Sequence, residues 1–436
     1  MAISVQVKEM SLITPSDTTP THILPLSSLD SQLFLRFTIE YLLLYNLVPG
    51  SDRSATTDAL KRALSRALVP YYPLSGRVQT RPDDSGLQVD CRAQGAIFVE
   101  AVASGSYLSD FESEPSFVTE RRKFLSLCVT DVLNGAPPLV MQLTWLADGA
   151  VALGVGFSHC ICDGIGSAEF LNSFGELAKL GDFKGKPVWQ RHLLDSTSQS
   201  HASCIDSVTH PEFNRVSDLC MFDSRFVEEK LTPTSVTFDK KSINELKKLA
   251  KIPGQNGESS SYTSFEVLSA HIWKAWATSL NLPPNQIIKL LFSINFRKRV
   301  EPSLPNGFYG NAIVLGCAHT TVKDITKKGL GYVTKLVKQA KEKVGNEYVR
   351  EVVDLVSHTR ACPDSVGVLI LSQWSKLGLD RVDFGMGRPV QVGPICTDRY
   401  CLLLPVADRK DAVKVMLAVP SYGVDKYKSL LRSNLV

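Results

Sequence analysis

The sequence lacks a strong charge of one sign, a long apolar run and a recognisable leader. Its 48 Lys and Arg residues against 44 Asp and Glu residues leave a net charge of +4. The basic residues form no stripe that could follow a nucleic-acid backbone, so we expect no nucleic-acid partner. No apolar run reaches the roughly 18 residues that a membrane span needs. Residues 1–14 lack the basic and apolar regions of a signal peptide, so we expect a cytoplasmic protein.

The ten cysteines are dispersed, and no C-x-x-C pair occurs among them. This argues against a disulfide framework and favours free thiols in a reducing compartment. Cys160 and Cys162 lie close to His159 in the sequence, which raises the question of zinc. A closed zinc site needs four ligands, and no second ligand pair lies nearby. We therefore expect no metal, and we interpret both cysteines as packing residues.

The length of 436 residues is too great for one core of usual size, which predicts at least two domains. Residues 181–220 are polar, rich in serine and without clear periodicity. A run of about 40 such residues is too long for an ordinary connection. We interpret it as a crossover linker between an N-terminal domain, residues 1–180, and a C-terminal domain, residues 221–436. Strand-like and helix-like segments are mixed in both, which predicts an α/β fold.

A histidine marks the junction of a predicted strand, residues 151–157, and a predicted helix, residues 165–180. His159 lies just past the strand, where binding and catalytic residues concentrate, and histidine can act as a base near neutral pH. Asp163 follows four residues later, and Gly164 permits backbone conformations closed to most other residues. With eight histidines, one H-x-x-x-D match is expected about 0.4 times by chance. The spacing alone therefore leaves an accidental match open.

Three local patterns predict individual elements. The step Asp148-Gly149 indicates a tight hairpin between strands at 139–146 and 151–157. Thr263 and Glu266 have the spacing of a capping box that opens a helix. Residues 322–343 carry the apolar spacing of a single helix.

A second motif, residues 383–389, reads Asp-Phe-Gly-Met-Gly-Arg-Pro and is by itself only a rigid turn. It follows the H-x-x-x-D-G run at 159–164 by roughly 220 residues. The pair resembles the H-x-x-x-D-G and D-F-G-W-G motifs of the plant BAHD acyltransferases. Further matches to that family are Tyr71–Arg77, Thr263–Glu266 with His271–Trp273, and Asn295–Arg299 with Gly310-Asn311. Several matches in one order are far more specific than either motif.

The resemblance implies two similar-sized mixed-sheet α/β domains of chloramphenicol-acetyltransferase-like type, joined by a long crossover. A tunnel between them would admit an acyl-CoA co-substrate from one side and a small-molecule acceptor from the other. His159 would be the general base that removes the proton of an attacking hydroxyl, a contribution of about 10²–10⁴-fold. We expect no permanently bound cofactor and a monomer.

The resemblance also implies roles for other residues. Asp163 would pair with an arginine, Arg297 in the first place and Arg299 in the second, and thereby hold the turn that presents His159. Ser372 and Trp374 match positions that supply oxyanion donors in some family members, although Trp374 is equally a core aromatic.

The expected contacts with CoA involve two other regions. Ser264 is a candidate for contacting CoA, or else it only supports the capping box. Asp383, Gly385 and Gly387 would shape the CoA channel, with Met386 in place of the family's tryptophan.

The sequence leaves the identity of the acceptor open. Residues 30–41 are predicted to line its pocket, and their apolar side chains favour a hydrophobic alcohol. An amine acceptor, giving an amide through the same base, is one alternative. A non-catalytic family member that acts as a protein partner is another.

Overall fold

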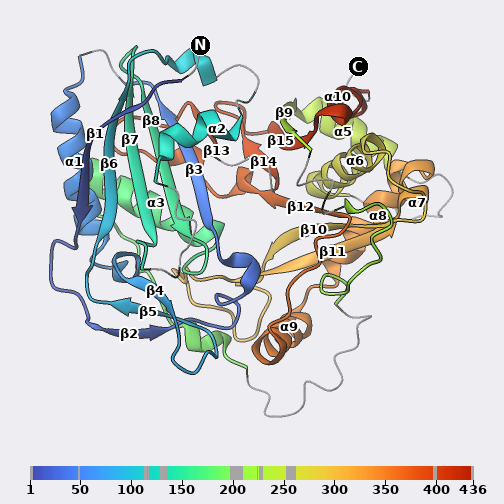
Figure 1. The fold of residues 1–436 in the computed structure, drawn as a ribbon, viewed down its shortest axis with the longest axis horizontal. Helices are drawn as coiled ribbons and strands as arrows, with labels where there is room; N and C mark the ends of the chain where they lie inside the picture. The colour runs from blue at the N-terminus through green and yellow to red at the C-terminus, as the bar shows by residue number, and fades with distance from the viewer. Residues whose placement is uncertain are drawn as a thin grey trace.

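The structure is a computed structural model. It describes residues 3–47, 50–111, 115, 117–127, 133, 135–196, 210–222, 224, 229–251, 262–395 and 400–433. Within these residues the chain forms two six-stranded sheets and one three-stranded sheet. Figure 1 shows the first large sheet at the left and the second at the right, with the small sheet below the first. Both large sheets contain parallel and antiparallel pairs, which confirms the predicted mixed α/β fold.

The first sheet has the order β1-β6-β7-β8-β3-β13, and the small sheet has the order β2-β5-β4. The strands of the first sheet are β1 (Gln6–Ile13), β3 (Thr38–Tyr45), β6 (Ala96–Ala103), β7 (Leu139–Leu146), β8 (Val151–Ser158) and β13 (Gln391–Pro394). Those of the small sheet are β2 (His22–Pro25), β4 (Arg77–Thr80) and β5 (Leu87–Cys91).

The predicted hairpin of β7 and β8 lies at the centre of the first sheet. The two strands pair antiparallel, and Gly149 takes the positive φ of +84° that the tight turn requires. Every residue of both strands is buried because the sheet is covered on both faces. Helices α1 (Arg53–Ala67) and α3 (Gly164–Leu180) pack on one face, and the segment from α2 (Val118–Arg121) to Leu125 packs on the other. The end of β8 is therefore held firmly.

The second sheet has the order β11-β10-β12-β14-β15-β9. Its strands are β9 (Leu231–Phe238), β10 (Ile287–Asn295), β11 (Ile313–Thr321), β12 (Val368–Gln373), β14 (Cys401–Pro405) and β15 (Val413–Pro420). The helices that follow β9 are α5 (Lys240–Leu249), α6 (Ser264–Ser279), α7 (Val322–Lys327), α8 (Leu330–Glu342), α9 (Asn346–Thr359) and α10 (Val424–Arg432).

Two local predictions in this half have different outcomes. The capping box of α6 is present, since Thr263 accepts from the Glu266 amide and Glu266 accepts from the Thr263 amide. The single helix predicted at 322–343 is wrong, because the chain forms α7 and α8 there. Lys328 takes an extended conformation and Gly329 caps α8, so the helical hydrogen-bond ladder is interrupted between them.

The two large sheets share core residues, and the first sheet contains strands from both halves of the chain. Strand β13 comes late in the chain but pairs antiparallel with β3 in the first sheet. Leu402 on β14 and Met416 on β15 pack in the same apolar cluster as Phe157 on β8. The division into residues 1–180, 181–220 and 221–436 stays a prediction, and β13 shows that chain order and sheet membership do not coincide.

Candidate active site

His159 lies at the meeting point of three segments. It follows Ser158, the last residue of β8, and its amide donates to the Phe37 carbonyl at 2.9 Å. Its ring lies against that of Phe37, with the centroids 5.0 Å apart. Its own carbonyl accepts from Asn311 Nδ2 at 2.6 Å. Because Asn311 belongs to the second half of the chain, the backbone of His159 is fixed from both halves.

His159 is 9% exposed, and its Nδ1 is buried without a hydrogen-bond partner among the described residues. Burial lowers the pKa of His159 below its usual range, although its own carbonyl and Asp163 act in the opposite direction. The ring is therefore neutral at pH 7, which is the form that can accept a proton.

Asp163 is the N-cap of α3 and is fully engaged in hydrogen bonds. Oδ1 accepts from the amides of Ile165 at 3.0 Å and Gly166 at 2.9 Å, and Oδ2 accepts from the Ala312 amide at 3.0 Å. The Arg297 guanidinium donates to both oxygens, at 2.9 and 3.0 Å. Burial would raise the pKa of Asp163, but the charge and hydrogen bonds of Arg297 and these amides bring it below its usual range.

The partner of Asp163 is thus Arg297, the arginine placed first from the sequence. Arg299 instead donates to the Val344 carbonyl at 2.9 Å. Arg297 also donates to the carbonyls of Phe308 and Gly310, so all three nitrogens of its guanidinium are engaged in hydrogen bonds. Asp163 has no capacity left to orient the His159 ring, and the geometry is that of an anchor for the turn.

The two cysteines of the motif are buried thiols. Burial raises the pKa of Cys160 to about 12 and raises that of Cys162 well above its usual range. Neither thiol is a thiolate near neutral pH, so neither has the character of a nucleophile. Among the described residues, no group of three or more His, Cys, Asp or Glu side chains could hold a metal ion.

Ser372 and Trp374 lie at the end of β12. Ser372 is half-buried, and Trp374 is buried with its ring 4.7 Å from that of Tyr41. The short turn that begins at Trp374 leads to Leu377, which lies 3.2 Å from the position that a Cβ on Gly164 would take. The structure therefore brings this turn against the first residue of α3. The oxyanion roles of Ser372 and Trp374 stay predictions.

The loop at residues 383–387 is attached to the far end of α3. Asp383 Oδ1 accepts from the amides of Gly385 at 2.9 Å and Gly387 at 3.0 Å, and both glycines have positive φ. Asp383 Oδ2 accepts from Lys179 Nζ at 2.5 Å. Met386 is buried in the same apolar cluster as Phe157. These contacts account for the loop's shape, and its part in a CoA channel stays a prediction.

Ser264 is the first residue of α6 and is exposed to solvent. The capping box beside it is closed by Thr263 and Glu266, so Ser264 is not one of the two residues that form it. An exposed hydroxyl at a helix N-terminus is compatible with a phosphate contact. Its assignment to CoA stays a prediction.

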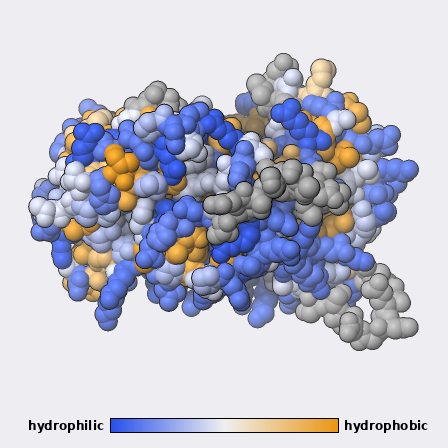
Figure 2. All heavy atoms as spheres, turned by 90° about the horizontal axis from the view of Figure 1, so that it is seen from below, coloured by the Kyte–Doolittle hydropathy of each residue, from blue (hydrophilic) through white to orange (hydrophobic). Residues whose placement is uncertain are grey.

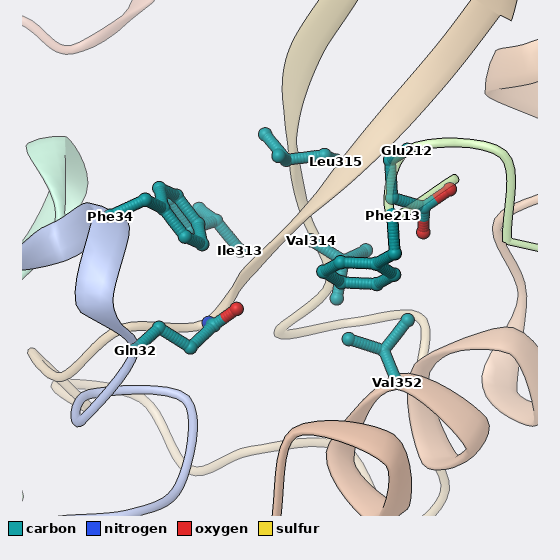
Figure 3. A pocket seen from close by; sticks show the side chains of 8 residues that line it. All are labelled: Gln32, Phe34, Glu212, Phe213, Ile313, Val314, Leu315 and Val352. Carbon is teal, nitrogen blue, oxygen red and sulfur yellow. The ribbon is translucent and has the colours of Figure 1, made fainter. Parts of the chain in front are cut away.

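Residues 30–41, predicted to line the acceptor pocket, range from fully buried to exposed. Asp30 is fully buried in a hydrogen-bond network, so its assignment to the pocket lining is wrong. Leu33 is 48% exposed, whereas Phe37 contacts His159. Phe34 lines the pocket in Figure 3 together with Gln32, Glu212, Phe213, Ile313, Val314, Leu315 and Val352. That pocket is built from both halves of the chain, with the rings of Phe34 and Phe213 on opposite sides of β11 residues.

Sequence reasoning missed Asp30, Arg191 and Asn311 as a group around the His159 turn. Asp30 and Arg191 are 161 positions apart along the chain, and Arg191 and Asn311 are 120 positions apart, so no local pattern links them. Only the Gly310-Asn311 match to the family gave a signal for one of the three.

The fold and site define a class, the two-domain α/β acyltransferases of chloramphenicol-acetyltransferase-like fold. The solved structure of F. sporotrichioides TRI101, complexed with coenzyme A and T-2, has a TM-score of 0.78 to this chain at 14% identity. The similarity covers 94% of this chain and 97% of that one. The Transferase family model matches residues 3–431, and the chain therefore belongs to this family, the BAHD acyltransferases.

Two curated plant proteins are similar along almost their whole length. Omega-hydroxypalmitate O-feruloyl transferase of Arabidopsis thaliana is 30% identical, over 98% of this chain and 92% of its own. Taxadien-5-alpha-ol O-acetyltransferase of Taxus chinensis is 31% identical, over 98% of this chain and 96% of its own.

In the described part of the chain, no helix combines the length and apolar character needed to cross a membrane. Figure 2 shows a face of two lobes on which hydrophobic side chains are scattered among hydrophilic ones.

Proposed function

We propose that this chain transfers an acyl group from a CoA thioester to the hydroxyl of a small hydrophobic acceptor, with His159 as general base in a ternary complex. The observation that carries this proposal is the neutral imidazole of His159, fixed at the end of β8 where both halves meet. The names of the two plant relatives support an alcohol acceptor, and the CoA in the TRI101 structure supports a CoA donor.

In this mechanism His159 removes the proton of the hydroxyl as its oxygen attacks the thioester carbonyl. Because Nδ1 is buried, we assign the proton transfer to Nε2. The tetrahedral intermediate collapses with cleavage of the C–S bond, and the CoA thiolate takes the proton back from His159. Ser372 and Trp374 would donate to the oxyanion of that intermediate.

The surroundings of His159 support a hydrophobic acceptor. Phe37 lies against the imidazole, and Tyr400 lies against Phe37 with ring centroids 5.7 Å apart. Aromatic rings at this position would contact an apolar body beside the reacting hydroxyl. In this proposal Ser264 and the 383–387 loop contact CoA, and the protein is a cytoplasmic monomer.

Thiol release tests the proposal. Purified protein is assayed with acetyl-, benzoyl-, hydroxycinnamoyl- and long-chain acyl-CoA against alcohols and amines. We expect turnover with at least one alcohol, and a loss of about 10²–10⁴-fold in His159→Ala.

The matched control is His271→Gln. His271 is also buried, and burial also lowers its pKa, but its Nε2 bonds the Leu431 carbonyl in the second half. This variant should keep its kcat. Absence of turnover with every pair, or equal turnover by His159→Ala, would refute the proposed function, and turnover only with amines would replace the acceptor class.

A further inference from the structure

Three buried polar residues from distant segments surround the turn that carries His159. Asp30 follows β2, Arg191 lies in the segment predicted as a crossover, and Asn311 precedes β11. Their exposed fractions are 0%, 3% and 0%. Buried groups of this kind must be matched by partners because burial removes their hydration. Two of them, Asn311 and Arg191, donate to backbone carbonyls of the turn, and Asp30 contacts both.

Asn311 connects Asp30 to the backbone of His159. Its Nδ2 donates to the His159 carbonyl at 2.6 Å and to Asp30 Oδ1 at 2.8 Å. The backbone N–H of Asn311 donates to the same Oδ1 at 3.0 Å. Asp30 is fixed in turn by Ser27, whose amide and hydroxyl donate to Oδ2 at 3.1 and 2.6 Å. The carbonyl of His159 is thereby tied to a carboxylate that cannot move freely.

Arg191 holds the other end of the turn. One of its terminal nitrogens donates to the Ile161 carbonyl at 2.6 Å, and the other donates to the Trp189 carbonyl at 2.8 Å. Its Nε lies 3.0 Å from Asp30 Oδ2 in an ion pair that is too bent for a hydrogen bond. The guanidinium carbon lies 4.0 Å from the centre of the Trp189 ring.

The space around Arg191 is closed on its remaining side. A Cβ on Gly310 would lie 2.3 Å from the guanidinium carbon, so any other residue there would displace Arg191 from its present position. Arg191 therefore has one position, set by stacking, by an ion pair and by a neighbour without a side chain. From that position it reaches the Ile161 carbonyl, two residues after His159.

We propose that Arg191 and Asp30 are positioning residues that fix both ends of the His159 turn, so that the crossover segment takes part in catalysis. This inference rests on the proposed function for its kinetic consequences. A displacement of about 1 Å at a catalytic group can cost about 10²-fold in rate. Arg191 contacts the Ile161 carbonyl on the turn, so its loss would move the imidazole without removing it.

The first test is Arg191→Lys, which keeps the positive charge but not the planar fork that reaches two carbonyls. We expect kcat to fall about 10²-fold while KM changes little. Asp30→Asn, which is nearly isosteric, is the second variant and covers the case that Arg191→Lys does not fold.

The matched control is Asp364→Asn. Asp364 and Lys289 form another buried ion pair, with exposed side-chain fractions of 9% and 2%, at the second sheet. The control should lose stability and keep its kcat. A merely structural role of Arg191 would give the same result as this control, and that result would overturn the inference.

A second readout does not depend on activity. In protein with 15N-labelled histidine, the ring signals of His159 are assigned by their loss in His159→Ala. Arg191→Lys and Asp30→Asn should shift the His159 signals and leave those of His271 in place, whereas Asp364→Asn should move neither. Unchanged His159 signals in both variants would overturn the inference. If the wild type turns over no substrate, the proposed function fails and the spectra alone decide the positioning role.

Discussion

Two aspartates at opposite ends of α3 use the same local device in different surroundings. Asp163 accepts from the amides of Ile165 and Gly166 at the start of the helix and pairs with Arg297. Asp383 accepts from two glycine amides of its own loop and pairs with Lys179 in the last turn. Each carboxylate thus closes a turn and anchors it to a cation from elsewhere.

The difference between the two sites is burial. The side chains of Asp163 and Arg297 are 1% and 11% exposed, whereas those of Asp383 and Lys179 are 19% and 51% exposed. A buried charge that loses its partner cannot be hydrated, so the loss is large. An exposed pair exchanges its partner for water at little cost. The catalytic turn therefore depends on its ion pair far more than the 383–387 loop does.

Asp163→Ala is expected to have the largest effect on stability. It removes an N-cap and leaves Arg297 buried without its carboxylate, a loss of about 3–5 kcal/mol in the free energy of unfolding. Urea denaturation of the wild type and the variant measures this loss. Asp383→Ala serves as the matched control, with a much smaller loss. Wild-type stability together with wild-type activity in Asp163→Ala would contradict the anchoring role.

The pH dependence of stability should separate the two aspartates next. In both, the pKa is below the usual value of 3.8 in the folded state despite the opposing effect of burial. Each therefore stabilises the fold above the unfolded pKa, and this contribution is lost as the pH falls through the folded pKa. Between pH 5 and pH 2, the urea midpoint of the wild type should fall, and that of Asp383→Asn should fall almost as steeply because this pair is more exposed to solvent. The urea midpoint of Asp163→Asn should fall less steeply than that of the wild type. An equal slope would contradict the larger contribution assigned to Asp163.

The smallest effect is expected from Lys179→Met. Because this lysine is half-exposed, loss of its pair with Asp383 should cost about 0–1 kcal/mol in the free energy of unfolding. Thiol-release activity should remain within twofold of the wild type if the two glycine amides hold the loop. A large loss of CoA affinity in this variant would show instead that the exposed end of α3 matters for the donor.

Local patterns predicted the parts of the fold that depend on neighbouring residues. The Asp148-Gly149 hairpin and the capping box at Thr263 are both present, because turn and cap geometry are set within a few residues. The family resemblance supplied the partner of Asp163, which no local rule could give.

What the sequence did not reveal depends on contacts between distant segments. Residues 30–41 were predicted to line the acceptor pocket, but Arg191 and Asn311 make Asp30 a buried anchor. Strand β13 has four residues, too few for a periodic signal, and its place is set by the edge of β3. The break at Gly329 was hidden because the apolar spacing continues on both sides of it.

The late arrival of β13 has a consequence for synthesis of the chain. Until residues 391–394 leave the ribosome, Tyr41, Leu42, Leu43 and Leu44 have no partner on one side of β3. At about 5–20 residues per second, some 10–40 s separate the completion of α3 from that of β13. During this interval the nascent first sheet presents an apolar edge that can pair with other chains. Chaperones that bind extended apolar strands would act on this protein in that interval.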